Sequence, residues 1–330
     1  MTEIEIRDPD APGTAPAADE PAPESPYKNL LVPLVVVPAL IVMVLVLVFV
    51  LFGAVAGEED SPRQNLDRLL NGGFNERKQA AFNLVRQVLE HEEAVAAERA
   101  PEWEIDASFL PELRAARESI GELAGPKDVA IPLVLSSLLA QLGDPAGVEQ
   151  LCAMTRLAEP LDPEREYRLY AAMTLGAIGP RLAERERALA AETLIALLDG
   201  DDSGLVLVAI AGLQNLPSPA TVPALAAMLA RSALELRVSA ALSLAALGDA
   251  AAVPVLREAL APEPYAAERA ASPRKWPPQR VSESRVKALE ALARLGQAPA
   301  RAALEELAEQ DADPNVKRAA RALLAAPGGG

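Results

Sequence analysis

The feature that most restricts the fold of this 330-residue chain is a unit that recurs from about residue 127 onwards. Each unit has an Ala- and Leu-rich stretch, a short corner, and a second stretch with an apolar stripe at helical spacing. In three of the five units an arginine stands eleven residues before the corner, at Arg168, Arg237 and Arg285. The corner residues are Gly143, Gly179, Pro217, Gly248 and Gly296, with separations of 36, 38, 31 and 48 residues.

The corner chemistry fits a chain of helix pairs. A glycine supplies the positive φ that ends a helix, and an aspartate after it can cap the next helix. Asp144 and Asp249 stand in that position. One helix pair cannot bury its apolar face, whereas stacked pairs share a continuous core. We therefore expect an all-α stack of helix pairs over residues 127–326, with a generic helical bundle as the alternative.

The most regular unit contains Arg237, then Leu247-Gly248-Asp249, then Val253-Pro254-Val255-Leu256. This order resembles the HEAT-repeat family, in particular the short type named after phycobilisome lyases. Leu142-Gly143-Asp144-Pro145 and Val222-Pro223-Ala224-Leu225 match that pattern in part, whereas the unit with Pro217 lacks both the glycine and the arginine. The resemblance covers about 200 of the 330 residues and implies a right-handed α-solenoid. It implies little about function.

A second constraint is the apolar run from Leu30 to Ala56, which is 27 residues long and has no charged, amide or hydroxyl side chain. A helix that spans a bilayer needs about 20 apolar residues. A buried core helix would keep one polar face, and this run has none. We therefore expect one transmembrane helix that anchors the chain in a lipid bilayer, as a single-pass protein of the bacterial inner membrane.

The segments on either side of the anchor have different compositions. Residues 1–28 are acidic and rich in Pro and Ala, which predicts a disordered tail. Ala54-Val55-Ala56 is similar to a cleavage site, but the run before it is about twice as long as a secretory apolar region, so an uncleaved anchor is favoured. The predicted parts are a tail (1–28), an anchor (29–57), a helical N-capping segment (58–126), the repeats (127–326) and a C-terminus (327–330).

The orientation of the anchor is nearly undetermined by positive charge, because Lys28 stands on one side of it and Arg63 and Arg68 on the other. A short tail before such an anchor usually stays in the cytoplasm. This base rate favours repeats on the non-cytoplasmic side.

Net charge and rare residues exclude several kinds of site. The formal charge is −16, of which −11 lies after the anchor, and this argues against binding nucleic acid over a broad face. Cys152 is the single cysteine and lies in an apolar stripe, so we expect it in the core. His91, the single histidine, stands among Glu90, Glu92 and Glu93. We expect it to be exposed at a helix end, with proton transfer as the alternative.

The long interval before Gly296 contains an insertion at residues 262–284. Arg269, Arg274, Lys275 and Arg280 concentrate positive charge there, and Tyr265 and Trp276 add aromatic rings. Prolines stiffen such a loop, and Trp and Arg are enriched at interface hot spots. One hypothesis is a docking loop for an acidic or proline-recognising partner. The alternative is a connector whose Trp folds back on the adjacent helices. The predicted partner-binding residues are Trp276, Arg274, Lys275, Arg280 and Tyr265.

The chain carries no Walker loop, GxSxG, HExxH or CxxC motif. We therefore expect no catalysis, no cofactor and no metal. The first functional hypothesis is a membrane-anchored scaffold for a protein partner, as an assembly subunit of a membrane complex. The second is an enzyme subunit like the bilin lyases, which only the resemblance implies and which the anchor disfavours. The third is a homo-oligomer built through the anchor and the end of the solenoid.

Overall fold

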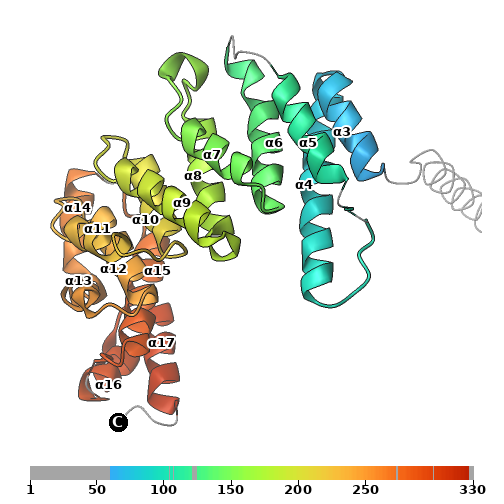
Figure 1. Cartoon of the computed structure of the whole chain (residues 1–330). Helices are drawn as coiled ribbons and strands as arrows, with labels where there is room; N and C mark the ends of the chain where they lie inside the picture. Colours follow the sequence, from blue (N-terminus) through green and yellow to red (C-terminus); the bar gives the residue numbers. More distant parts are fainter. Residues whose placement is uncertain are drawn as a thin grey trace, which may run out of the picture. The chain divides into compact units, whose positions relative to one another are not determined.

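The computed structural model describes residues 60–326 except 104, 107, 121–124, 273 and 300 (Figure 1). The chain divides into two compact units, Met1–Glu59 and Asp60–Gly330. The predicted anchor lies in the first unit and therefore outside the described residues. The second unit is helical where it is described, without strands. None of the helices within the described ranges is both long and apolar enough to cross a bilayer.

Five helix pairs flank the five predicted corners, one pair after the next along the chain (Figure 1). The prediction of stacked helix pairs is thereby confirmed, whereas the right-handed twist stays a prediction. The pairs are α6 (Ala130–Gln141) with α7 (Pro145–Met154), α8 (Glu166–Ile178) with α9 (Glu184–Leu197), α10 (Ser203–Leu213) with α11 (Thr221–Met228), α12 (Leu234–Ala246) with α13 (Val253–Leu260), and α15 (Pro278–Arg294) with α16 (Arg301–Gln310).

Five further helices flank or interrupt these pairs. Gly72 and Gly73 separate α3 from α4. These helices are α3 (Pro62–Asn71), α4 (Phe74–Ala96), α5 (Phe109–Ser119), α14 (Glu263–Ala271) and α17 (Pro314–Ala325).

The first helix of each pair packs against the first helix of the next. Contacts join α4 to α6 and then run through α8, α10, α12 and α15 to α17. One hydrophobic cluster extends from Leu133 in α6 to Leu292 in α15, and smaller clusters continue it at both ends. A shared core of this kind is how a helix pair with one apolar face becomes stable. The row formed by α4, α6, α8, α10, α12, α15 and α17 is called the first-helix face below.

Three corners have the predicted geometry. Gly143, Gly248 and Gly296 have φ of 80°, 79° and 67°. The carboxylates of Asp144 and Asp249 accept hydrogen bonds from backbone N–H groups at the start of the next helical segment, at 2.9 and 2.8 Å. Both the helix ends and the caps are therefore confirmed at the units that carry the Gly-Asp pattern.

The corner at Gly179 differs, because its φ is −44° and a 3₁₀ turn begins there. A Cβ on Gly179 would stand 2.6 Å from the carbonyl oxygen of Asn215, which lies in the next unit. Glycine is needed here for a close approach between units and not for a positive φ.

The closest contact between first helices involves two glycines. A Cβ on Gly176 in α8 would stand 2.5 Å from the Cα of Gly212 in α10. The amide of Asn215 also donates a hydrogen bond to the carbonyl oxygen of Gly176, at 3.1 Å. The backbones of α8 and α10 therefore meet at a point where no side chain fits.

Gly176→Ala is expected to destabilise the repeats by about 2 kcal/mol. Forcing α8 and α10 apart costs about 1–3 kcal/mol, and the obstructing atoms are backbone, so the upper part of that range applies. The better helix propensity of alanine returns less than about 1 kcal/mol. The measurement is urea unfolding followed by circular dichroism. Gly125→Ala is the control, because a Cβ there meets nothing within 4 Å. Equal stability of the two variants would contradict the close approach.

Candidate functional site

The predicted insertion is mostly helix and not loop. Glu263–Ala271 form α14, and Pro278 already begins α15. Ala, Glu and Arg in α14 have good helix propensity. The prolines on both sides of this run favoured a loop in the prediction from sequence. Pro278 at the start of α15 is favourable, because the first helical N–H has no intrahelical partner. Pro273 lies outside the described residues.

Both aromatic rings of the insertion lie in the core. Tyr265 is 0% exposed and Trp276 is 3% exposed. Their ring centroids are 4.8 Å apart at an interplanar angle of 77°, an edge-to-face contact. The Tyr265 hydroxyl donates to the carbonyl oxygen of Ala259 at 2.9 Å. Both rings hold α14 against its neighbours, as the alternative for this segment proposed for Trp276, and partner binding through them stays a prediction.

Glu268 joins α14 to Trp276 and to the start of α12. The sequence offered no signal for this role. The carboxylate of Glu268 accepts hydrogen bonds from the Trp276 indole N–H at 2.8 Å and from the backbone N–H of Leu234 at 2.6 Å. Burial alone would raise the pKa of this carboxyl, but these hydrogen bonds and that of Lys275 outweigh burial and hold the pKa below its usual value.

The predicted cations of the insertion differ in how far they are engaged. The ammonium of Lys275 lies 3.2 Å from the carboxylate of Glu268. The guanidinium of Arg280 lies 5.1 Å from the centre of the Trp276 ring and also pairs with Glu235. Arg274 is exposed and forms no ion pair within the described part of the chain. Partner binding by these three residues stays a prediction.

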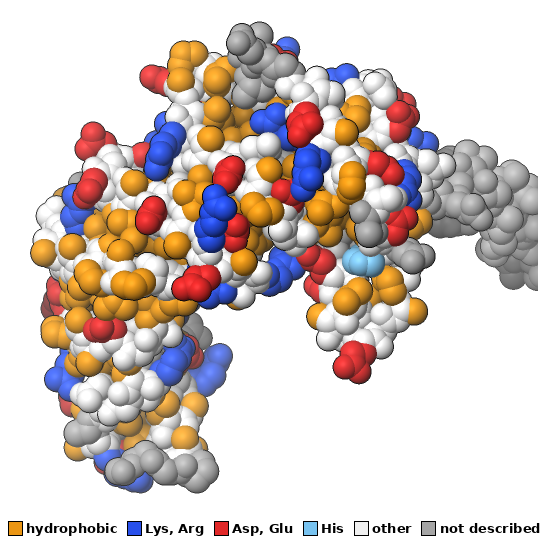
Figure 2. Space-filling view, in the orientation of Figure 1, with side chains coloured by type: hydrophobic (Ala, Val, Ile, Leu, Met, Phe, Trp, Pro, Cys, Tyr) orange, Lys and Arg blue, Asp and Glu red, His pale blue; other side chains and the backbone are white. Residues whose placement is uncertain are grey.

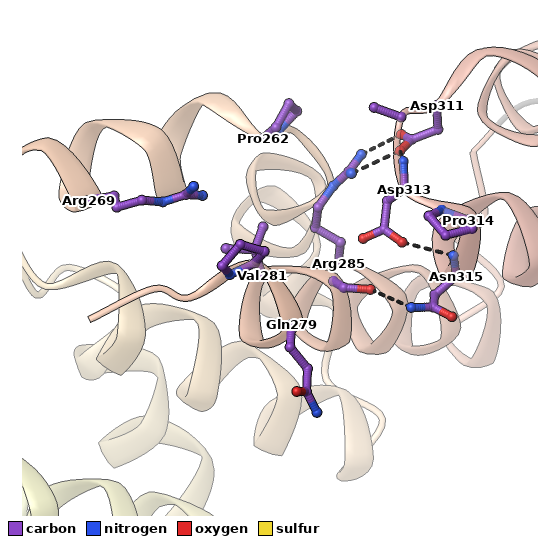
Figure 3. A pocket seen from close by; sticks show the side chains of 12 residues that line it. Pro262, Arg269, Gln279, Val281, Arg285, Asp311, Asp313, Pro314 and Asn315 are labelled. Atoms are coloured by element: carbon purple, nitrogen blue, oxygen red, sulfur yellow. Dashed lines mark hydrogen bonds and ion pairs between the residues drawn. The ribbon is translucent and has the colours of Figure 1, made fainter. Parts of the chain in front are cut away.

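A pocket of about 490 Å³ lies between α14, the start of α15 and the turn that leads into α17 (Figure 3). Its side chains come from segments on both sides of the helix pair α15–α16, so no local sequence pattern could reveal it. The lining residues are Pro262, Arg269, Pro278, Gln279, Val281, Ser282, Arg285, Asp311, Ala312, Asp313, Pro314 and Asn315.

One wall of this pocket is a buried ion pair. The side chains of Arg285 and Asp311 are 6% and 8% exposed and form two parallel hydrogen bonds, at 3.0 and 2.5 Å (Figure 3). The Nε of Arg285 also donates to the carbonyl oxygen of Leu260 at 2.6 Å. Burial alone would raise the pKa of the Asp311 carboxyl, but the hydrogen bonds from Arg285 and from the backbone of Asp313 lower it.

The other repeated arginines also bind groups outside their own helix. Arg168 donates to the buried carboxylate of Asp162 at 3.1 Å, and Arg237 donates to the carbonyl oxygen of Ser232 at 3.1 Å. Arg237 also pairs with Glu258, at 2.6 Å. Each arginine therefore links its first helix to a neighbouring connection or helix.

Among the residues that the structure describes, the first-helix face has open grooves at three places. The first, about 280 Å³, lies between α4, α6 and α8. The second, about 340 Å³, lies between α10, α12 and α15, and the third, about 510 Å³, between α15 and α17. One face of the described repeats therefore offers a succession of grooves.

Two large exposed apolar side chains line the first of these grooves. Phe82 is 66% exposed and Tyr170 is 42% exposed, and both line it. All the large exposed apolar side chains within the described residues lie on α4 and α8. Figure 2 shows charges of both signs mixed with apolar side chains on the visible face, without a broad area of one sign among the described residues. The exposed apolar residues are Phe74, Phe82, Leu89, Val95, Tyr170 and Met173.

The single cysteine and the single histidine lie apart from these surfaces. Cys152 is buried, as predicted, and burial raises the pKa of its thiol. His91 lies inside α4 and is half-buried, so the prediction of an exposed histidine at a helix end is wrong. Its Nδ1 is 2.8 Å from the carbonyl oxygen of Trp103, which holds the connection from α4 to α5.

The sequence model described as HEAT repeats matches residues 191–272. This part of the chain is similar to HEAT repeats. The match runs from α9 to the end of α14 and includes the unit with Pro217, which has neither the corner glycine nor the arginine. The HEAT-repeat resemblance is supported over this segment, whereas the phycobilisome-lyase type stays a prediction. No curated protein matches the chain.

Proposed function

We propose that this chain is a membrane-anchored, non-catalytic HEAT-repeat scaffold that binds a protein partner in a membrane complex. The observation that carries the proposal is the groove between α4, α6 and α8, where large apolar side chains are exposed together. Apolar patches of this kind on soluble domains mark sites of macromolecular contact. Helical repeats supply such surfaces in general.

The chemistry of the groove favours an apolar helix of the partner. Its floor is formed by Ala130, Leu133 and Val134 of α6, and aromatic side chains of α4 and α8 form its walls. An amphipathic helix binds such a groove through apolar residues at helical spacing. The apolar run at residues 30–56 supports the anchor, and the acidic charge of the chain disfavours nucleic acid.

The test uses the full chain in native membranes, with a photoreactive amino acid in place of Met173 beside the groove. We expect the chain to stay in the membrane pellet after a carbonate wash and to cross-link to one other protein. Phe82→Glu with Tyr170→Glu should reduce that cross-link at least tenfold, because two charges then stand in an apolar groove.

Val95→Glu is the matched control, since Val95 is exposed on α4 but does not line the groove. Release of the chain by carbonate would contradict the anchor. A cross-link to a second copy of the chain would replace the scaffold hypothesis with the homo-oligomer. Turnover of a small molecule by the purified chain would contradict the absence of catalysis.

A further inference from the structure

We propose that the pocket between α14, α15 and α17 binds a carboxylate side chain of a partner protein, with Arg269 as its ion-pair partner. This pocket shares no residue with the apolar groove between α4, α6 and α8 and is a second site. It depends on the proposed function only in taking a protein as the ligand.

Arg269 is the unsatisfied group of the pocket. It projects from α14 towards the pocket (Figure 3), and its Nε is buried without any hydrogen-bond partner in the described part of the chain. A buried donor without a partner destabilises the folded chain, and more so when the donor is charged. A ligand in the pocket would meet the accessible nitrogens of this guanidinium, and by accepting hydrogen bonds from them it would give Arg269 the ion-pair partner that it lacks within the described residues.

The other polar side chains of the pocket already have partners. Arg285 and Asp311 neutralise each other, and the carboxylate of Asp313 caps α17 by accepting from the N–H of Asn315 at 2.8 Å. The amide of Asn315 donates to the hydroxyl of Ser282 at 3.0 Å (Figure 3). Arg269 and Asp313 are therefore the charged side chains of the lining that form no ion pair within the described residues, and Arg269 is the cation of the two.

A carboxylate matches this charge better than other anions. The planar guanidinium presents two parallel N–H groups, which fit the two oxygens of a carboxylate. Asp313 lines the same pocket, and its negative charge disfavours ligands with several charges, such as phosphate.

The walls of the pocket indicate that the carboxylate belongs to a peptide. Pro262, Pro278, Pro314 and Val281 form an apolar part of the lining beside the ion pair, and a volume of about 490 Å³ is far larger than one carboxylate needs. An extended segment with a single acidic residue between small or proline residues would fill the pocket and place its carboxylate at Arg269.

The test measures binding of a labelled peptide, acetyl-Ala-Pro-Glu-Pro-Ala-amide, to the full chain in detergent micelles by fluorescence anisotropy. The same peptide with Gln in place of Glu is the matched probe. We expect the Glu peptide to bind at least tenfold more tightly than the Gln peptide. Arg269→Gln should abolish this preference, and Arg269→Lys should retain only part of it, because lysine lacks the planar fork.

Two further variants control for general electrostatic attraction and for folding. Arg274→Gln makes the same charge change on the insertion outside the pocket, and binding should stay unchanged. Asp313→Asn should tighten binding at least twofold by removing a like charge, and asparagine still caps α17. The thermal midpoint of Arg269→Gln should stay close to that of the wild type, because the Nε that is replaced makes no hydrogen bond within the described residues.

Equal affinity for the Glu and Gln peptides, or equal losses in Arg269→Gln and Arg274→Gln, would overturn the proposal. A fall of several degrees in the midpoint of Arg269→Gln would do the same, since it would assign Arg269 a structural role. Free glutarate should bind at least tenfold more weakly than the Glu peptide, and equal binding would make the ligand a small carboxylate. If the peptide test fails and the cross-link at Met173 is intact, the scaffold proposal stands. If the cross-link is absent and the Glu peptide binds as expected, the proposal of a carboxylate site at Arg269 stands.

Discussion

Trp276→Ala is expected to destabilise the repeats by about 3–5 kcal/mol, the usual cost of removing a buried tryptophan ring. The ring packs edge-to-face on Tyr265, carries the guanidinium of Arg280 on its face and donates to Glu268. Without the ring, α14 would lose this packing contact, and the pocket that contains Arg269 would lose the wall that α14 forms. Urea unfolding gives the total effect, and amide hydrogen exchange over α14 shows where it acts.

Two variants separate packing from charge in this experiment. Trp276→Phe keeps a ring but loses the N–H to Glu268, so we expect an intermediate loss of stability. Arg274→Ala changes an exposed side chain nearby and should stay within about 0.5 kcal/mol of the wild type. Wild-type stability of Trp276→Ala would mean that the ring is exposed, as a docking residue would be.

Arg285→Met is expected to cost about 3–5 kcal/mol, because it leaves the carboxylate of Asp311 buried without its partner. The carbonyl oxygen of Leu260 loses its donor as well. Arg237→Met is the matched control at the same position of another repeat. Its carboxylate partner, Glu258, is exposed, so we expect a cost near about 1 kcal/mol. Urea unfolding measures both variants.

The effect of the ion pair should depend on pH in one direction. The pKa of Asp311 is lower in the folded chain than its usual value near 3.9, so its stabilising contribution is complete above that value. The contribution is lost as the pH falls through the folded pKa. The stability difference between the wild type and Asp311→Asn should therefore be largest at neutral pH and shrink below about pH 4. A difference that is constant from pH 7 to pH 3 would contradict an ionised Asp311.

The helix pairs could be predicted because their signals are local. Gly143 and Gly248 end helices through their own φ, and Asp144 and Asp249 cap helical segments within two residues. The corner at Gly179 shows the limit of this reasoning. Its glycine serves a contact with Asn215 in another unit, which the corner pattern could not distinguish from a helix end.

The candidate site was predicted only in part. The charged and aromatic composition of residues 262–284 identified a segment with a special role, but it assigned that role to Trp276 and Tyr265, which are core residues. Arg269 was named only as one of several cations. Whether Arg269 forms an ion pair depends on which carboxylates lie near it in the folded chain. Glu268 pairs with Lys275, and Asp311 pairs with Arg285.

The sequence by itself determined the helical units, their corners and caps, the core position of Cys152 and the apolar run at residues 30–56, because each depends on spacing within a few residues. Only the tertiary structure decided which side chains of the insertion face the core, where the glycines of α8 and α10 meet, and that the Nε of Arg269 is buried without a hydrogen-bond partner among the described residues. The physical reason is that burial and charge pairing depend on neighbours from distant parts of the chain. These neighbours meet only when the helix pairs stack.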